Sequence, residues 1–190
     1  MKKIWFIGIS RGKKFFYEIK NIQILIDAAP KDYRIIITTT LPIHYINLES
    51  RGYSPKTIKK DLNRLKNKFN RIITTLLDAN KNIEYIKWEQ LEDFERFNEY
   101  KLYFRNNDKL FNKIYKLSSK VLSNSCKREP LEKDIIKATQ YLIRECAVIR
   151  NIKDYFKIDY CTNAYSKNMN ILDILSDVNW LDNWFPNKKI

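Results

Sequence analysis

A serine follows the first apolar run of the chain directly. Residues 4–9 are almost continuously apolar and lead into Gly8-Ile9-Ser10-Arg11-Gly12. In open α/β sheets, ligands bind just outside the carboxyl ends of the strands. A strand over residues 4–9 would therefore present Ser10 at such a site, as a candidate nucleophile. The alternative is that Ser10 only caps a turn.

The same segment matches the G-x-S-x-G nucleophile elbow of α/β-hydrolases, in which an acid and then a histidine follow the serine along the chain. The sequence has one histidine, His44, and it precedes most of the fold. A serine hydrolase, which would cleave simple activated esters, is therefore the less favoured alternative.

A carboxylate interrupts an apolar stripe later in the chain. The stripe follows alternating steps of four and three, the spacing of one helix face: Leu131, Ile135, Ala138, Leu142, Glu145 and Ile149. An unpaired buried carboxylate is costly, so either a Lys or Arg of the protein pairs with Glu145 or a cationic ligand does. Tyr141 lies one helical turn earlier, so both side chains could hold one group.

One predicted helix, over residues 54–77, is strongly basic. Only Asp61 opposes seven cations between positions 56 and 71, which are Lys56, Lys59, Lys60, Arg64, Lys66, Lys68 and Arg71. Such a row suits the phosphates of a nucleic acid and positions it without reading its sequence. The alternative is an ordinary solvated face. No helix-turn-helix, zinc-finger or RNP motif accompanies the row, which argues against a base-reading regulator.

The elements that would position these residues alternate between strands and helices. Apolar runs predict strands over residues 4–9, 33–40, 83–88 and 155–159. The run over 4–9 is continuous and not alternating, which suits a strand buried on both faces. Helical periodicity predicts helices over 54–77, 107–122, 131–149 and 169–184. This alternation indicates an α/β fold with a mostly parallel sheet. No linker divides the chain, so residues 1–190 are expected to form one domain.

The composition favours a folded protein that meets polyanions. The chain has 190 residues, a net charge of +14, 44% hydrophobic residues and 14% aromatic residues, too apolar for a disordered basic tail. No apolar run approaches the ~20 residues that cross a bilayer, so no membrane association is expected. Three cysteines and one histidine form no recognisable zinc site or disulfide framework. A cytoplasmic location and no bound metal are expected.

Taken together, these features resemble the tRNA-dependent cyclodipeptide synthases. That family opens with a buried strand ending in G-I-S, then a polar loop and an aromatic pair, as in Gly8-Ile9-Ser10 and Lys13-Lys14-Phe15-Phe16. A long basic helix follows, and later a helix with Y-x-x-x-E, here Tyr141 to Glu145. A tyrosine beyond the next strand is best matched by Tyr165, with Tyr160 as the alternative.

The sequence departs from the family pattern at three positions. Lys13 stands where one branch keeps an asparagine, and Ser166 stands where the branches have histidine or proline. Ala147 replaces a proline that usually follows the glutamate by two residues. These departures leave the branch open, whereas Ser10, Tyr141 and Glu145 match.

The resemblance implies a Rossmann-like three-layer fold, similar to the catalytic domain of class I aminoacyl-tRNA synthetases but without their ATP-activation site. It implies that Ser10 accepts the acyl group of a first aminoacyl-tRNA. A second aminoacyl-tRNA would then give a dipeptidyl-enzyme, which cyclises to a diketopiperazine in a ping-pong scheme. Tyr141 and Glu145 would hold the α-amino group, and Tyr165 would relay or position a proton.

Under the same resemblance, the basic helix would hold the first tRNA, no cofactor is needed and a monomer is expected. Strand order suggests that the aminoacyl pocket lies near Ile7, Gly8 and Ile37. The sequence leaves one further alternative open, a non-catalytic basic module that binds tRNA or another RNA.

Overall fold

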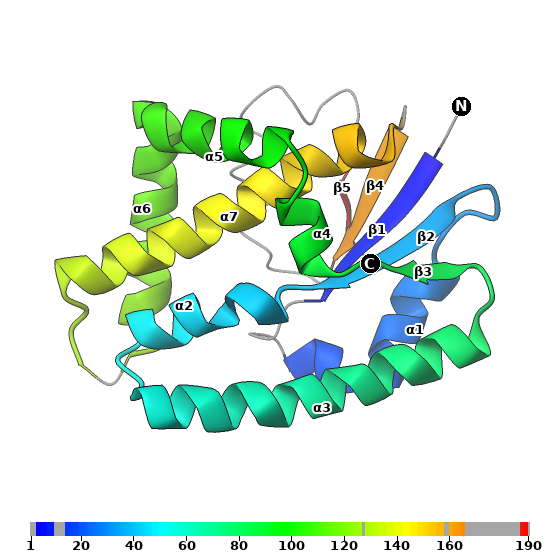
Figure 1. The fold of residues 1–190 in the computed structure, drawn as a ribbon, viewed down its shortest axis with the longest axis horizontal. Coiled ribbons are helices and arrows are strands. Elements are labelled where there is room, and N and C mark those ends of the chain that lie inside the picture. The colour runs from blue at the N-terminus through cyan, green and yellow to red at the C-terminus, as the bar shows by residue number, and fades with distance from the viewer. Residues whose placement is uncertain (1–2, 10–13, 127, 158–159, 166–186, 190) are drawn as a thin grey trace.

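The computed structural model describes residues 3–9, 14–126, 128–157, 160–165 and 187–189 (Figure 1). These residues form a parallel sheet of five strands in the order β3-β2-β1-β4-β5. The strands span Lys3–Ile9 (β1), Arg34–Thr39 (β2), Ile83–Tyr85 (β3), Tyr160–Tyr165 (β4) and Asn187–Lys189 (β5). β1 lies at the centre, so its carboxyl end opens between two neighbours.

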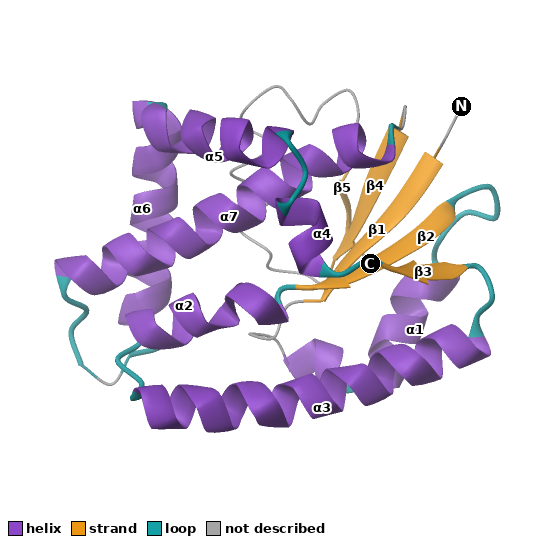
Figure 2. Ribbon diagram, viewed as in Figure 1, coloured by secondary structure: helices purple, strands orange, loops and turns teal. Residues whose placement is uncertain are grey.

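Helices cover both faces of the sheet (Figure 2). One face carries α1 (Ile19–Asp27), α3 (Pro55–Ala79) and the 3-10 turn η1 (Lys14–Tyr17). On the other face lie η2 (Leu41–Ile43), α2 (His44–Ser50), α4 (Trp88–Glu92) and α7 (Glu132–Phe156), and α5 (Arg96–Asn106) and α6 (Asp108–Ser123) pack against α7. The predicted three-layer α/β architecture is confirmed.

The central strand β1 contributes to two separate cores. Trp5 and Ile7 pack with the side chains of α1 and α3, whereas Ile4 and Phe6 pack with those of α2 and α4 to α7. Successive side chains of a strand point to opposite faces, and helices cover both faces here. The apolar run of residues 4–9 therefore has no polar alternation, which is why it is typical of a central parallel strand.

The start of α3 follows from its first residues. Ser54 Oγ accepts a hydrogen bond from the Thr57 backbone N–H at 3.3 Å, and Pro55 occupies the first helical position. α6 begins similarly, with Asn107 Oδ1 accepting from the Leu110 N–H at 3.1 Å. The helices predicted over 54–77 and 107–122 are confirmed to within two residues at each end.

The strand predicted over residues 155–159 is wrong. Tyr155 and Phe156 end α7, Lys157 has a positive φ of 48°, and the strand itself is β4, Tyr160–Tyr165. The two aromatic residues continue the apolar face of α7, and Tyr155 packs edge-on against Phe94 with ring centroids 5.6 Å apart. A short apolar run alone does not separate a strand from the last turn of a helix.

Three other boundaries differ, and one remains untested. The helix predicted over residues 131–149 is α7, which continues to Phe156. The strand predicted over 83–88 ends at Tyr85, and Trp88 already begins α4. Leu131, placed on the buried stripe of α7, precedes the helix and is 51% exposed. The helix predicted over 169–184 lies outside the described residues.

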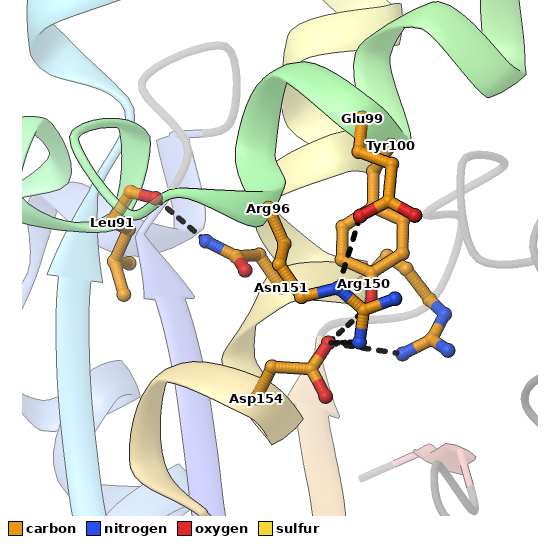
Figure 3. A network of polar contacts seen from close by, with 7 residues as sticks. All are labelled: Leu91, Arg96, Glu99, Tyr100, Arg150, Asn151 and Asp154. Atoms are coloured by element: carbon orange, nitrogen blue, oxygen red, sulfur yellow. Dashed lines mark hydrogen bonds and ion pairs between the residues drawn. The ribbon is translucent and has the colours of Figure 1, made fainter.

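A polar network at Asp154 ties α7 to α5 (Figure 3). The Tyr100 hydroxyl donates to Asp154 Oδ2, which also lies 3.4 Å from Arg96 Nη1 and 3.9 Å from Arg150 Nη1. Both guanidinium groups also lie against the Tyr100 ring, at 5.1 and 4.7 Å from its centroid. Burial, and then the bond to Asp154, raises the pKa of Tyr100 to about 12, so the phenol stays protonated and keeps donating.

Two further residue pairs tie α7 to α4. The Asn151 side-chain amide donates to the Leu91 carbonyl oxygen at 2.9 Å (Figure 3). Arg144 forms a two-pronged ion pair with Glu92, with Nε to Oε1 at 2.8 Å. α7 is thus fixed by its neighbours on both sides of Glu145.

Candidate active site

The carboxyl ends of β1, β2 and β4 lie at one edge of the sheet. Ile9, the last residue of β1, is paired with Thr39, and its carbonyl oxygen accepts from the Thr40 N–H at 3.3 Å. Ser10, the predicted nucleophile, comes next in the sequence and lies outside the described residues. The edge on which the sequence argument for Ser10 depends is therefore present.

Tyr165 and Tyr160 lie at opposite ends of β4. Ile7 is paired with Ala164, so Tyr165 ends β4 beside the carboxyl end of β1, whereas Tyr160 is paired with Lys3 at the far end. The sequence had suggested that Tyr165 lies in a loop beyond a strand. In the structure it is instead the last residue of β4. Its backbone position favours it over Tyr160 as the tyrosine nearest to the predicted nucleophile.

Tyr141 and Glu145 form a hydrogen-bonded pair on α7. The Tyr141 hydroxyl donates to Glu145 Oε1 at 2.7 Å, as the one-turn spacing predicts. Thr40 Oγ1, just beyond β2, lies 3.5 Å from the same hydroxyl, and the His44 ring of α2 packs edge-on against the Tyr141 ring at 6.4 Å between centroids. The pair therefore lies beside the carboxyl edge of the sheet.

Burial controls the protonation of this pair. It raises the pKa of Glu145 to about 7, partly offset by the hydrogen bond from Tyr141, which stabilises the ionised carboxylate. Although the residue as a whole keeps some accessible surface, its carboxyl group is enclosed enough for burial to dominate. Burial, and then the charge of Glu145, raises the pKa of Tyr141 well above its usual value, so Tyr141 remains a donor.

The carboxylate has no cationic partner in the described part of the protein. No Lys or Arg among those residues forms an ion pair with Glu145, although Arg144 beside it is paired with Glu92. The alternative that a Lys or Arg of the protein pairs with Glu145 thus has no support among the described residues. The arrangement can receive a ligand ammonium group, or take a proton from one, at a pH near the pKa of Glu145.

The three residues suggested for an aminoacyl pocket do not share one face of the sheet. Ile7 and Ile37 are fully buried among the side chains of α1 and α3. Gly8 belongs to the opposite face, which is the face that Tyr141 packs against. The structure brings Gly8 and Thr38 to the side of Tyr141, and places Ile7 and Ile37 on the other side.

All seven cations predicted on α3 are exposed, and they form two rows. At 3.6 residues per turn, Lys60, Arg64, Lys68 and Arg71 follow one side of the helix, and Lys59 and Lys66 follow the other, with Lys56 between them. The first row borders a recess of about 500 Å³ against α1, lined by Arg64, Lys68, Arg71 and four neighbours. Lys68 Nζ also lies 4.5 Å from the centroid of the Tyr17 ring in η1.

Sequence reasoning missed Thr40 and His44, which contact the Tyr141 ring or hydroxyl. The rule that selected Ser10 could also have selected Thr40, because Thr40 directly follows a buried strand. In the described residues there is no cluster of three or more His, Cys, Asp or Glu side chains arranged to hold a metal ion. Nor does any helix there have the length and apolar character needed to span a membrane.

Solved structures with a similar fold are found, although the sequence itself matches no protein-family model and no curated protein. Among solved structures, AlbC, a cyclodipeptide synthase from Streptomyces noursei, superimposes with a TM-score of 0.78 over 100% of this chain and 96% of its own, at 15% identity. Rv2275 from Mycobacterium tuberculosis, described as showing that cyclodipeptide synthetases are related to type I tRNA synthetases, gives 0.71 over 92% and 77%, at 14% identity.

A third structure contains RNA. The cyclodipeptide synthase of Candidatus Glomeribacter gigasporarum, bound to Phe-tRNAPhe, matches with a TM-score of 0.63 over 98% of this chain and 87% of its own, at 18% identity. At these identities the similarity establishes the fold. The resemblance expected from the sequence is confirmed at that level: the chain has the fold of the cyclodipeptide synthases, which is related to that of class I tRNA synthetases.

Proposed function

We propose that this protein is a tRNA-dependent cyclodipeptide synthase, which joins the acyl groups of two aminoacyl-tRNAs into a diketopiperazine. The observation that carries the proposal is the Tyr141–Glu145 pair. A buried carboxylate without a described cation partner lies beside the carboxyl edge of the sheet, in a fold shared with cyclodipeptide synthases. Its missing partner is the α-amino group of the substrate.

The proposed reaction needs no activation step, because each substrate arrives as an ester. Ser10 Oγ attacks the acyl carbon of the first aminoacyl-tRNA, the bond to the ribose oxygen breaks, and that oxygen leaves with the serine proton. The amino group of the aminoacyl-enzyme then attacks the ester of a second aminoacyl-tRNA. This forms a peptide bond, releases the second tRNA and leaves a dipeptidyl group on Ser10.

Ring closure completes the proposed cycle. The free amine of the dipeptidyl group attacks the ester carbon on Ser10, a second peptide bond forms, and Ser10 regains its proton. Glu145 holds the ammonium group and takes a proton when the amine becomes a nucleophile, a role that suits a pKa of about 7. Tyr141 orients the carboxylate. Tyr165, at the end of β4, positions or relays a proton of the reacting groups.

The function is tested by incubating the purified chain with mixed aminoacyl-tRNAs and searching the products for diketopiperazine masses. Cyclic dipeptides that depend on both the protein and charged tRNA support the proposal. Tight tRNA binding without any such product would favour the non-catalytic RNA-binding alternative. Cleavage of simple esters in the absence of RNA would favour the serine hydrolase.

The two rows of cations on α3 are expected to contribute unequally to tRNA binding. Arg64 and Arg71 line the recess against α1, and Lys59 and Lys66 lie on the other side of the helix with the same spacing of seven residues. We expect R64E/R71E to weaken tRNA binding on the order of 10²-fold, because phosphate contacts are lost and replaced by repulsion. Filter binding at several salt concentrations measures the change.

K59E/K66E is the matched control, since it changes the charge by the same amount at the same spacing. At physiological salt, charges that do not touch the RNA are largely screened, so we expect a loss of about threefold at most. Equal losses in the two variants would mean that only the overall charge of α3 matters, and would remove the distinction between the rows.

A further inference from the structure

A second concave site lies on the helical side of the molecule, between α2, α5, α6 and α7. It encloses about 570 Å³, within the roughly 300–1,000 Å³ that is usual for ligand sites. Ile46, Phe111 and Ile143 form its buried or half-buried floor. We call this site the helical groove. It lies on a different face of α7 from Tyr141 and Glu145.

The edge of the helical groove leaves large apolar side chains open to solvent. Tyr45 is 40% exposed, Leu102 50% and Ile136 41%, and all three line the groove. Exposed apolar side chains gathered around a cavity are typical of binding surfaces, whereas scattered ones are not. An aromatic ring open at the edge of a groove offers a stacking platform to a planar group.

The charge of the helical groove is positive. Two of its cations are occupied, because Lys137 pairs with Glu49 at 3.1 Å and Arg144 pairs with Glu92. Lys101 and Arg105, one turn apart on α5, form no ion pair with any carboxylate in the described ranges. Lys101 Nζ lies over the Phe97 ring at 5.5 Å, and the Arg105 side chain is exposed. The groove therefore combines an apolar floor with two cations available to an anion.

A nucleotide fits this combination best. Its base presents an aromatic face to Tyr45 and the apolar floor, and its phosphate presents an anion to Lys101 and Arg105. The bases of a duplex are stacked inward and cannot enter such a cavity, whereas unpaired nucleotides can. The excess of basic residues in the whole chain, 36 against 22 acidic, favours a polyanion over a neutral ligand.

We propose that the helical groove is a second RNA-binding site, which takes unpaired nucleotides of an aminoacyl-tRNA at a surface separate from α3. Only the identification of the RNA as aminoacyl-tRNA rests on the proposed function. The groove itself is defined by Tyr45, Lys101 and Arg105.

The test uses a fluorescein-labelled single-stranded RNA hexamer that contains 4-thiouridine. Irradiation of its complex with the full chain is expected to crosslink the RNA to peptides that contain Tyr45 or Phe111, identified by mass spectrometry. In anisotropy titrations, we expect K101E/R105E to weaken binding about tenfold and to lower the slope of log K against log salt by about 1.4, for two phosphates on a single strand. Tyr45→Leu keeps an apolar side chain but removes the ring, and should weaken binding at least about fivefold.

K116E/K120E on α6 is the matched control. It reverses two exposed lysines that are also four residues apart but do not line the groove. We expect its affinity for the hexamer to change about twofold at most, since these charges are screened from the site. Equal losses in the two double variants, or crosslinks confined to peptides of α3, would overturn the inference.

The inference and the proposed function can fail separately. If the chain produces diketopiperazines but the hexamer does not crosslink in the helical groove, the inference alone is wrong. If the hexamer crosslinks there and no diketopiperazine forms with charged tRNA, the groove remains an RNA site and the proposed function is wrong.

Discussion

Replacing Ser10 with alanine is expected to reduce diketopiperazine formation by at least about 10³-fold, because alanine lacks the hydroxyl oxygen on which the proposed acyl intermediate forms. The affinity for tRNA should stay within about twofold of the unchanged protein, since phosphate contacts hold the RNA. Intact-protein mass spectrometry after addition of aminoacyl-tRNA should show one added acyl or dipeptidyl mass, and no addition in Ser10→Ala.

Ser123→Ala provides the control for this substitution, because Ser123 is an exposed serine at the end of α6. It should keep both the adduct and the product. Ser10→Cys tests whether residue 10 carries the acyl group, since a thiol can form the corresponding intermediate as a thioester. Product formation by Ser10→Ala at the normal rate would show that the acyl group is not carried on Ser10, and would end the proposed mechanism.

Glu145→Gln is expected to reduce activity on the order of 10²-fold and, at alkaline pH, to stabilise the protein. The first effect follows because an amide neither holds an ammonium group by charge nor accepts a proton from it. In the unchanged enzyme, kcat/KM should rise with pH through about 7, where Glu145 ionises. The remaining activity of the variant should lack this rise.

The second effect follows from the direction of the pKa shift. Folding raises the pKa of Glu145 from 4.5 to about 7, so the folded protein binds the proton more tightly than the unfolded chain does. The resulting stability is fully present below about pH 4.5 and is lost as the pH rises through 7. We expect this loss to be about 3 kcal/mol, from about 1.4 kcal/mol for each unit of pKa. Glutamine does not ionise, so the variant should not lose this stability as the pH rises.

Urea denaturation at pH 5 and pH 8 measures this difference. Glu145→Gln should match the unchanged protein at pH 5 and exceed it at pH 8. Glu129→Gln, which changes an exposed glutamate, should follow the unchanged protein at both values. A variant at residue 145 that is equally destabilised at both pH values would show that the carboxylate has a packing role, and would contradict the raised pKa.

The sequence predicted the parts of the fold that depend on local signals. β1 was recognisable because a strand covered on both faces needs apolar side chains at nearly every position. α3 was recognisable because Ser54 and Pro55 mark its start and its apolar side chains keep one stripe. Glu145 stood out because the same periodicity brought a carboxylate into a stripe of apolar residues. These features need no knowledge of distant contacts.

Distant contacts account for what the sequence did not predict. Thr40 and His44 meet Tyr141 from about one hundred residues away in the chain, through the packing of α2 against α7. The helical groove is assembled from four helices, none of which carries a motif for it. The strand expected over 155–159 was wrong because the packing of Tyr155 against Phe94, which belongs to the tertiary structure, extends α7 over those aromatic residues.

The central position of β1 also determines when the protein can complete its fold during synthesis. β1 leaves the ribosome before the other four strands of the sheet, and it pairs on one side with β2, the next strand along the chain. Its other edge pairs with β4, residues 160–165, so that edge stays open until β4 has been made. An apolar strand with an unpaired edge readily associates with other chains. The nascent protein is therefore expected to depend on chaperones, and to aggregate when its translation stalls before β4.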